Sequence, residues 1–263
     1  FDKEFPNNKK ICMSKLVIAI SCLVFCFFSS CNEVGPADNQ TSGNIKISID
    51  ETYKPVMEEQ LKVFLARFTN AKNTAEFKPE ADCFKDYRED TTRVIFVTRE
   101  LSEEENKYAL SKQIVSKSMA MARDAIAFIT AKDAKQKDFK ITELKEILTG
   151  KNANYQIVFD NKKSSTVRYI NASILKGATL SSNVFASNSS DEVIQYVSTH
   201  PNTIGVIGVS WVADHADSTV ENFLQKVNIA GVWPDNDSVN AYIKPYQAYI
   251  GLKEYPCTRT FYF

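Results

Sequence analysis

The sequence predicts an α/β fold whose sheets are mainly parallel. Strand-like runs alternate along the chain with amphipathic stretches, which is the pattern of α/β folds. Polar turns with capping residues separate the two kinds of segment. The chain has 263 residues, of which 44% are apolar and 24% charged. This composition is that of a globular protein with room for one large domain or two lobes.

Residues 1–31 are expected to be an export leader. Lys9, Lys10 and Lys15 precede the apolar run 16–28, and small residues then lead to Cys31. This order is typical of a secretory signal, and the run is shorter than a membrane span. The small residues followed by a cysteine resemble a bacterial lipobox, so Cys31 is the candidate lipidation residue. An uncleaved anchor is the alternative. The polar residues 32–43 are expected to form a tether.

The first expected elements alternate between strand and helix. Residues 44–50 alternate apolar and polar side chains and predict a strand, whereas residues 56–68 have apolar side chains near helical spacing. A short strand at 75–77, a helix or loop at 82–88 and a strand at 92–97 follow.

A capping signal opens the next part of the chain. Ser102 is followed three places later by a Glu, which predicts a helix start. Residues 114–120 and 124–130 then predict two strands. The amphipathic residues 141–148 predict a helix that Gly150 ends.

The remaining elements continue the alternation. The residue patterns predict strands at 155–159, 204–211, within 239–249 and at 255–263, and helices at 167–175 and 193–197.

Several function classes find no support. With 32 basic and 32 acidic residues the chain has no net charge to attract nucleic acid. Beyond the leader, Cys83 and Cys257 are either a disulfide or two buried thiols, and they form no metal motif with His200 or His215. The sequence predicts no metal, no cofactor and no catalytic residue, since neither a nucleophile elbow nor a phosphate-binding loop is present.

Polar side chains suited to a small anion follow three predicted strands. In open α/β sheets, ligands bind at the carboxyl ends of strands. Each group also has a structural interpretation, as a helix cap or a surface ion pair. The three groups are Asp50, Glu51 and Thr52; Thr98 and Arg99; and Ser164, Ser165 and Thr166.

An ordered set of motifs resembles one family. The set covers residues 47–52, 97–102, 122–129, 141–151, 164–166, 205–208 and 255–259. It is similar to the phosphate-binding proteins of ABC phosphate transporters (PstS-like), in their lipoprotein form.

The resemblance implies a type II periplasmic binding protein, with two α/β lobes joined by two crossover strands, near 124–130 and 206–211. Lobe 1 would combine residues 44–125 with 212–263, and lobe 2 would be 126–211. Because the family continues past its last strand, lobe 1 is expected to be incompletely covered.

The resemblance also implies the ligand-binding residues. Two positions depart from the family: Asp160 stands where it has Arg, and Ser165 replaces a glycine. The implied ligand set is Glu51, Thr52, Thr98, Arg99, Ser164, Ser165 and Thr166, with Asp50 and Arg168 as secondary candidates.

The expected function is that of an exported, membrane-anchored, monomeric lipoprotein of the cell envelope. It would capture inorganic phosphate or a similar oxyanion and deliver it to an ABC permease. A sensing, adhesion or scaffold lipoprotein with a degenerate cleft is the first alternative. An exported hydrolase is the second.

Overall fold

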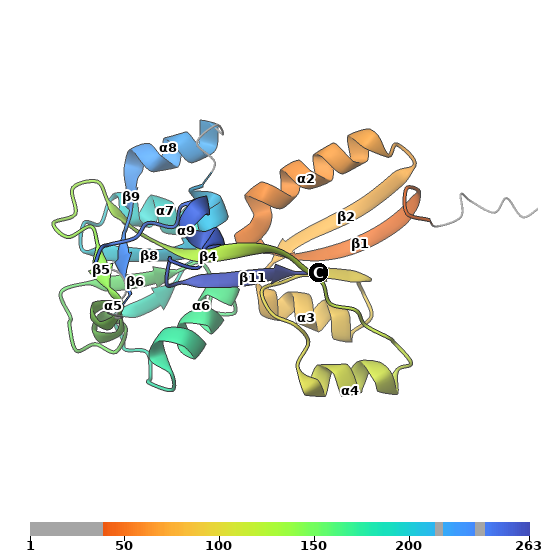
Figure 1. Ribbon diagram of the computed structural model, residues 1–263, viewed down its shortest axis with the longest axis horizontal. Helices are drawn as coiled ribbons and strands as arrows, with labels where there is room; N and C mark the ends of the chain where they lie inside the picture. The colour runs from red at the N-terminus through yellow and green to blue at the C-terminus, as the bar shows by residue number, and fades with distance from the viewer. Residues whose placement is uncertain (1–38, 214–217, 235–239) are drawn as a thin grey trace, which may run out of the picture. The chain divides into compact units, whose positions relative to one another are not determined.

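The computed structural model describes residues 39–213, 218–234 and 240–263. The predicted leader with Cys31, and residues 32–38 of the predicted tether, lie outside these residues. Residues 44–263 form one unit, in which strand β4 (Ala120–Ala131) extends through two lobes (Figure 1). None of the described helices combines the length and the apolar character needed to cross a membrane.

The first lobe is built on a three-stranded sheet of order β2-β1-β3. Strands β1 and β3 are parallel, with Ile49 opposite Phe96. A small core of Ile47, Ile49, Tyr53, Met57 and Phe261 packs against this sheet. The elements are β1 (Gly43–Asp50), η1 (Glu51–Tyr53), α2 (Lys54–Arg67), β2 (Ala71–Lys78), α3 (Glu80–Arg88), β3 (Val94–Phe96) and α4 (Glu103–Ser111).

The second lobe is built on a six-stranded sheet of order β11-β4-β8-β6-β7, with β9 also paired to β4. A small sheet joins β10 to β5. The elements from β5 onward are β5 (Phe139–Lys140), α5 (Ile141–Leu148), β6 (Gln156–Phe159), α6 (Ser165–Tyr169), η2 (Ile170–Leu175), β7 (Val184–Ala186), α7 (Ser190–Ser198), β8 (Thr203–Gly208), η3 (Val209–Trp211), α8 (Ser218–Lys226), β9 (Val227–Ile229), β10 (Val232–Trp233), α9 (Gln247–Gly251) and β11 (Thr258–Tyr262).

Strand β4 belongs to both lobes. Its first half pairs antiparallel with β11, and its residues from Ile126 to Ile129 pair antiparallel with β8. Strand β11 also reaches the first lobe, through a bridge between Tyr262 and Val97. The two strands predicted at 114–120 and 124–130 are therefore replaced by one. Val115 is 79% exposed and lies outside any strand, because it has no sheet face to pack on.

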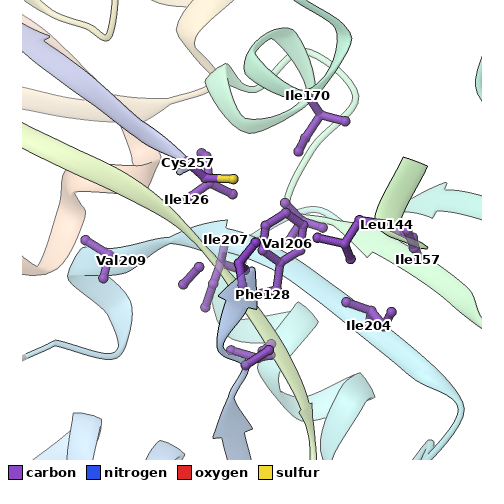
Figure 2. Close-up of a cluster of buried hydrophobic side chains, with 14 of the residues drawn as sticks. Ile126, Phe128, Leu144, Ile157, Ile170, Ile204, Val206, Ile207, Val209 and Cys257 are labelled. Carbon is purple, nitrogen blue, oxygen red and sulfur yellow. The ribbon is translucent and has the colours of Figure 1, made fainter. Parts of the chain in front are cut away.

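The large core lies in the second lobe. It is made by aliphatic side chains of β4, β6 and β8 with those of the covering helices, among them Phe128, Leu144, Ile157 and Val206 (Figure 2). Strands β6 and β8 are parallel and buried on both faces, which explains their unbroken apolar sequences.

Most predicted elements are confirmed, including the Ser102 capping box and the helix at 141–148. The strand predicted within 239–249 is wrong for its described part, where an isolated bridge at Ile243 is followed by helix α9. Cys83 and Cys257 are buried free thiols in separate hydrophobic clusters.

The segment 212–263, predicted as the second part of lobe 1, contacts both lobes, and the division into lobes stays a prediction. Residues such as Val212, Phe223, Val227 and Ile250 pack into the large core of the second lobe. The physical reason is that β9 continues the sheet beside the end of β4. Within the described part of this segment, β11 reaches the first lobe through Phe261 and Tyr262.

Gly205 provides a test of the packing between β8 and its neighbours. A Cβ atom there would lie 2.7 Å from Ile129 Cγ1 and 2.7 Å from Val193 Cγ1. We expect Gly205→Ala to lower the free energy of unfolding by about 1–3 kcal/mol, because a closely packed core accepts an added carbon only with strain. Urea denaturation would measure the change.

Gly251 is the matched control, since no heavy atom beyond its chain neighbours and own helix backbone lies within 4 Å of a Cβ placed there. Gly251→Ala should leave the free energy of unfolding within about 0.5 kcal/mol of the wild-type value. Equal losses in the two variants would contradict the packing argument.

Candidate functional site

Polar residues from both lobes meet around Arg259, which lies on β11 and is 7% exposed. Its Nε donates to Asp124 Oδ2 at 2.6 Å. Its Nη1 donates to Ser165 Oγ at 2.7 Å and its Nη2 to Thr52 Oγ1 at 3.0 Å. Although burial by itself lowers the pKa of Arg259, the charges of Tyr53 and Asp124 raise it above the usual value. The guanidinium therefore stays charged and is held from three sides.

The local backbone allows this close approach. Thr52 lies in η1, directly after β1, and its Oγ1 is 3.4 Å from Ser165 Oγ of the other lobe. A Cβ atom at Gly208 would lie 2.9 Å from Thr52 Cβ and 3.3 Å from Arg259 Nη2. Glycine is thus needed at the end of β8 for the two lobes to meet here.

The three hydroxyls after β6 are all buried. Ser164 caps helix α6, accepting from Val167 N and donating to Asn161 O. Its Oγ is also 2.7 Å from Thr166 Oγ1. Thr166 in turn donates to Asp160 Oδ1 at 2.5 Å. The predicted cap is therefore real, and the hydroxyl of Ser165 is the one that reaches Arg259.

A second cluster joins the lobes through Glu80 at the start of α3. Arg168 Nε donates to Glu80 Oε2 at 2.6 Å, and Arg168 Nη2 donates to Thr98 Oγ1 at 2.5 Å. Thr98 donates to Glu80 Oε1 through its backbone N at 2.8 Å and its Oγ1 at 2.6 Å. Burial raises the pKa of Glu80, but the bonds and charge of Arg168 outweigh this and lower it.

Glu51 contacts the other lobe at α7. Its carboxylate accepts from Ser190 N at 3.3 Å and from Ser190 Oγ at 3.1 Å. Burial, and then the charge of Asp160, raise the pKa of Glu51 to about 7.

The contacts of Arg99 are with other residues than Arg259 and its hydroxyl partners. Its guanidinium forms a two-point ion pair with Glu105, at 2.7 and 2.9 Å, and lies over the ring of Phe84. The hydrogen bonds from Arg99, with the backbone bond from Ser102, lower the pKa of Glu105 to about 2 against a smaller opposing effect of burial. Its role as a ligand contact stays a prediction.

Asp50 and Asp160 are fully buried carboxyl groups at the site. Asp50 Oδ1 accepts from Thr52 N at 3.2 Å, and Asp160 Oδ1 accepts from Asn161 N at 2.9 Å. The Oδ2 atom of each has no hydrogen-bond partner among the described residues. Burial raises the pKa of Asp50 to about 7 against the charge of Arg259, and burial also raises that of Asp160.

This donor set suits a small oxyanion. A buried guanidinium and several hydroxyls can donate directed hydrogen bonds to anionic oxygens without a metal. In the part of the chain that the structure describes, no cluster of His, Cys, Asp or Glu is arranged to hold a metal ion. A cavity of about 590 Å³ lies beside Ser164, Arg168 and Glu80.

Local sequence signals found part of this site and missed the rest. Thr52, Ser165 and Thr166 follow predicted strands, and this position predicts them as site residues. Arg259 and Glu80 are not predicted as site residues, because Arg259 lies within a strand and Glu80 begins a helix. No local pattern marks either, since their partners are distant in sequence.

Comparison with known proteins gives the fold a wider context. A family model described as a PBP superfamily domain matches residues 34–263. No curated protein sequence matches the chain significantly.

Three solved structures show the same fold, each with 84% of this chain covered. A putative phosphate ABC transporter substrate-binding protein with bound phosphate from Clostridium perfringens is 21% identical, with 85% of that chain covered and a TM-score of 0.69. An ABC-type phosphate transport receptor from Vibrio cholerae is 12% identical, with 85% covered and a TM-score of 0.58. The CcmR regulatory domain of Synechocystis PCC6803, in complex with 2-PG, is 12% identical, with 86% covered and a TM-score of 0.56. The fold is the α/β type II periplasmic binding protein fold.

The Glu80–Arg168 pair generates a testable prediction. Arg168→Met leaves Glu80 buried without its counter-charge, so we expect the free energy of unfolding to fall. Because the side chain of Arg168 is 37% exposed, the loss at pH 7 should be about 1–2 kcal/mol, less than for a fully buried pair.

The sign of the pH dependence follows from the lowered pKa of Glu80. In the wild type, the stabilisation by this carboxylate is present above its unfolded pKa and is lost as pH falls through the folded pKa. In Arg168→Met the pKa of Glu80 should rise, so the deficit should shrink between pH 7 and about pH 4.5. Urea denaturation at both pH values would measure it.

Lys163→Met is the control, because it breaks the exposed pair with Asp82 and should cost less than about 0.5 kcal/mol. A deficit for Arg168→Met that is independent of pH would contradict the role given to Glu80.

Proposed function

The chain belongs to the PBP superfamily, and from this premise we propose that it is an extracytoplasmic solute-binding lipoprotein. It captures phosphate or a similar small oxyanion between its two lobes and delivers it to an ABC importer. The fold is a binding-protein fold, typically non-catalytic. Export and anchoring through a lipid on Cys31 are part of the proposal.

One observation carries this proposal. The buried guanidinium of Arg259 donates at once to Thr52 from the first lobe and to Ser165 from the second. A buried cation surrounded by hydroxyls from both sides is a donor set that an oxyanion can satisfy when it enters between the lobes. Thr166 and Ser164 supply further hydroxyls beside Ser165.

The contacts between lobes support a binding cycle. Ser210 donates to Thr52 O, Glu51 accepts from Ser190, and Arg168 pairs with Glu80. These bonds join the lobes around the hydroxyl cluster. A ligand that adds bonds to both lobes would favour this arrangement over an open one, and a permease could recognise it.

One observation favours a second candidate. Thr52 and Ser165 already have Arg259 as a hydrogen-bond partner, and the buried carboxyl of Asp160 lies next to the hydroxyls. A lipoprotein that senses or adheres through the same fold, with a degenerate cleft, would show these features. Binding measurements separate the two candidates.

We expect phosphate to bind and to raise the melting temperature, because a ligand held by the folded state alone stabilises it. In a panel of phosphate, sulfate, molybdate and small carboxylates, phosphate should give the largest shift. Ser165→Ala removes one hydroxyl from the site and should weaken phosphate binding about tenfold, since a hydrogen bond to a charged group contributes about 1.5 kcal/mol or more. Calorimetry would measure both constants.

Ser111→Ala is the matched control. Ser111 is exposed at the end of α4, and its hydroxyl donates to Tyr108 O, so phosphate affinity should stay at the wild-type value. The absence of any shift with millimolar phosphate would overturn phosphate capture and support the second candidate.

A further inference from the structure

The cavity of about 590 Å³ next to the hydroxyl cluster is larger than a small anion needs. Ser164 lines this cavity, whereas Ser165 and Arg259 do not, so the cavity begins beside the groups proposed to hold the oxyanion. An inorganic oxyanion fills the space of a few water molecules, each of about 30 Å³. Cavities that hold small organic ligands measure about 300–1,000 Å³. The space is therefore sufficient for an organic group attached to the anion.

Both lobes give this cavity an apolar lining. Ala81 and Phe84 of the first lobe line it, as do Val167 and Ala172 of the second. Hydrocarbon that contacts such side chains leaves water, and this stabilises a complex in proportion to the apolar area removed from solvent. An organic group lying here would also contact both lobes, as the anion itself would.

The aromatic part of the lining is fixed by its neighbours. The guanidinium of Arg99 lies 3.5 Å from the centre of the Phe84 ring and forms a two-point ion pair with Glu105, at 2.7 and 2.9 Å. Phe84 is itself buried. Because its charge is already paired, Arg99 contributes a fixed surface to the cavity. Little side-chain ordering is then left for a ligand to impose, which favours binding.

Two cations of the cavity keep donors for a further polar group. Arg168 binds Glu80 through Nε and Nη2, and Thr98 through Nη2, and its Nη1 has no acceptor among the described residues. Lys162 is exposed and pairs with none of the acidic side chains that the structure describes. An unpaired surface lysine is common, but this one lines the same cavity as Arg168 and Ser164. An acidic group within the cavity would therefore meet positive charge.

We propose, resting on the proposed function, that the site takes organic phosphates and phosphonates with one short apolar substituent that ends in an acidic group. The oxyanion binds at Arg259 and the hydroxyl cluster. The substituent passes Ser164 and lies in the cavity against Phe84 and Val167, and its acidic end meets Lys162. Inorganic phosphate is then the smallest member of the ligand class.

The first test compares ligands of the wild-type protein by calorimetry at pH 7. Methylphosphonate reaches little of the cavity, propylphosphonate adds an apolar chain, and 3-phosphonopropionate ends a chain of the same length in a carboxylate. We expect propylphosphonate to bind about tenfold more tightly than methylphosphonate, because its longer chain leaves water. A further gain of about threefold is expected for 3-phosphonopropionate, from attraction between a partly exposed pair of charges. Inorganic phosphate is measured alongside.

The second test fills the cavity. Ala172 is an exposed residue of η2 whose side chain lines the cavity, so Ala172→Phe places a ring where the substituent would lie. The tenfold gain of propylphosphonate should disappear, whereas the affinity for inorganic phosphate should stay at the wild-type value. Ala66→Phe is the matched control, because Ala66 is an exposed residue of α2 outside the cavity lining, and it should keep the gain.

The third test removes the charge proposed for the acidic end. Lys162→Met should lower the affinity for 3-phosphonopropionate to that for propylphosphonate, and the affinity for propylphosphonate itself should not change. Lys151→Met removes an exposed charge of the same sign after α5, outside the cavity lining, and should keep the threefold difference.

The outcomes separate this inference from the proposed function. If phosphate binds but propylphosphonate binds no more tightly than methylphosphonate, the inference alone is wrong, and an unchanged gain in Ala172→Phe has the same meaning. Equal affinities for propylphosphonate and 3-phosphonopropionate would overturn the part given to Lys162. Binding of the phosphonates without binding of phosphate would support the inference and overturn phosphate capture. No binding of any of these ligands would overturn both. If circular dichroism shows that Ala172→Phe is unfolded, the wild-type series and Lys162→Met decide.

Discussion

The buried ion pair between Arg259 and Asp124 is the contact on which the site depends. The two residues lie directly opposite each other on β11 and β4, so the register of this antiparallel pair sets the position of the guanidinium. With Nε fixed by Asp124, the two terminal nitrogens reach Thr52 and Ser165. A buried charge without its partner would cost several kcal/mol. The site is thus centred on a cation that the sheet holds in place.

Around this cation, the lobes are joined by contacts of different strength. Beside Arg259, the hydroxyls of Thr52 and Ser165 approach each other from the two lobes, and both also accept from Arg259. In the second cluster, the contact between the lobes is the ion pair of Arg168 with Glu80. Because the side chain of Arg168 is partly exposed, its pair is sensitive to solvent and salt, whereas the contacts of Arg259 are shielded. The contacts of Arg259 therefore depend on close packing of the two lobes, and the pair of Arg168 with Glu80 adds electrostatic attraction between them.

The sequence predicts those elements and site residues whose pattern lies within a few neighbouring residues, and it does not predict those that depend on contacts between distant parts of the chain. The Ser102 capping box and the amphipathic helix at 141–148 were predictable because their patterns span a few residues. Ser165 and Thr166 were found because they follow a strand. Arg259 was not found, since its partner in the sheet is 135 residues away in sequence. The continuity of β4 was missed because its first residues are exposed and are held in the strand by pairing with the distant β11, which no local hydrophobic pattern marks.

Strand β4 has a consequence for how the molecule forms. Its two halves receive their partners from different parts of the chain: β8 and β9 pair with the end nearer the second core, and β11 pairs with the other. As the chain is synthesised from its N-terminus, strands β4, β6, β8 and β9 of the second lobe are all made before β11. The first lobe and the cation at the centre of the site are completed last, by contacts of long sequence separation, which form slowly. The candidate site is then complete only in molecules whose folding has finished.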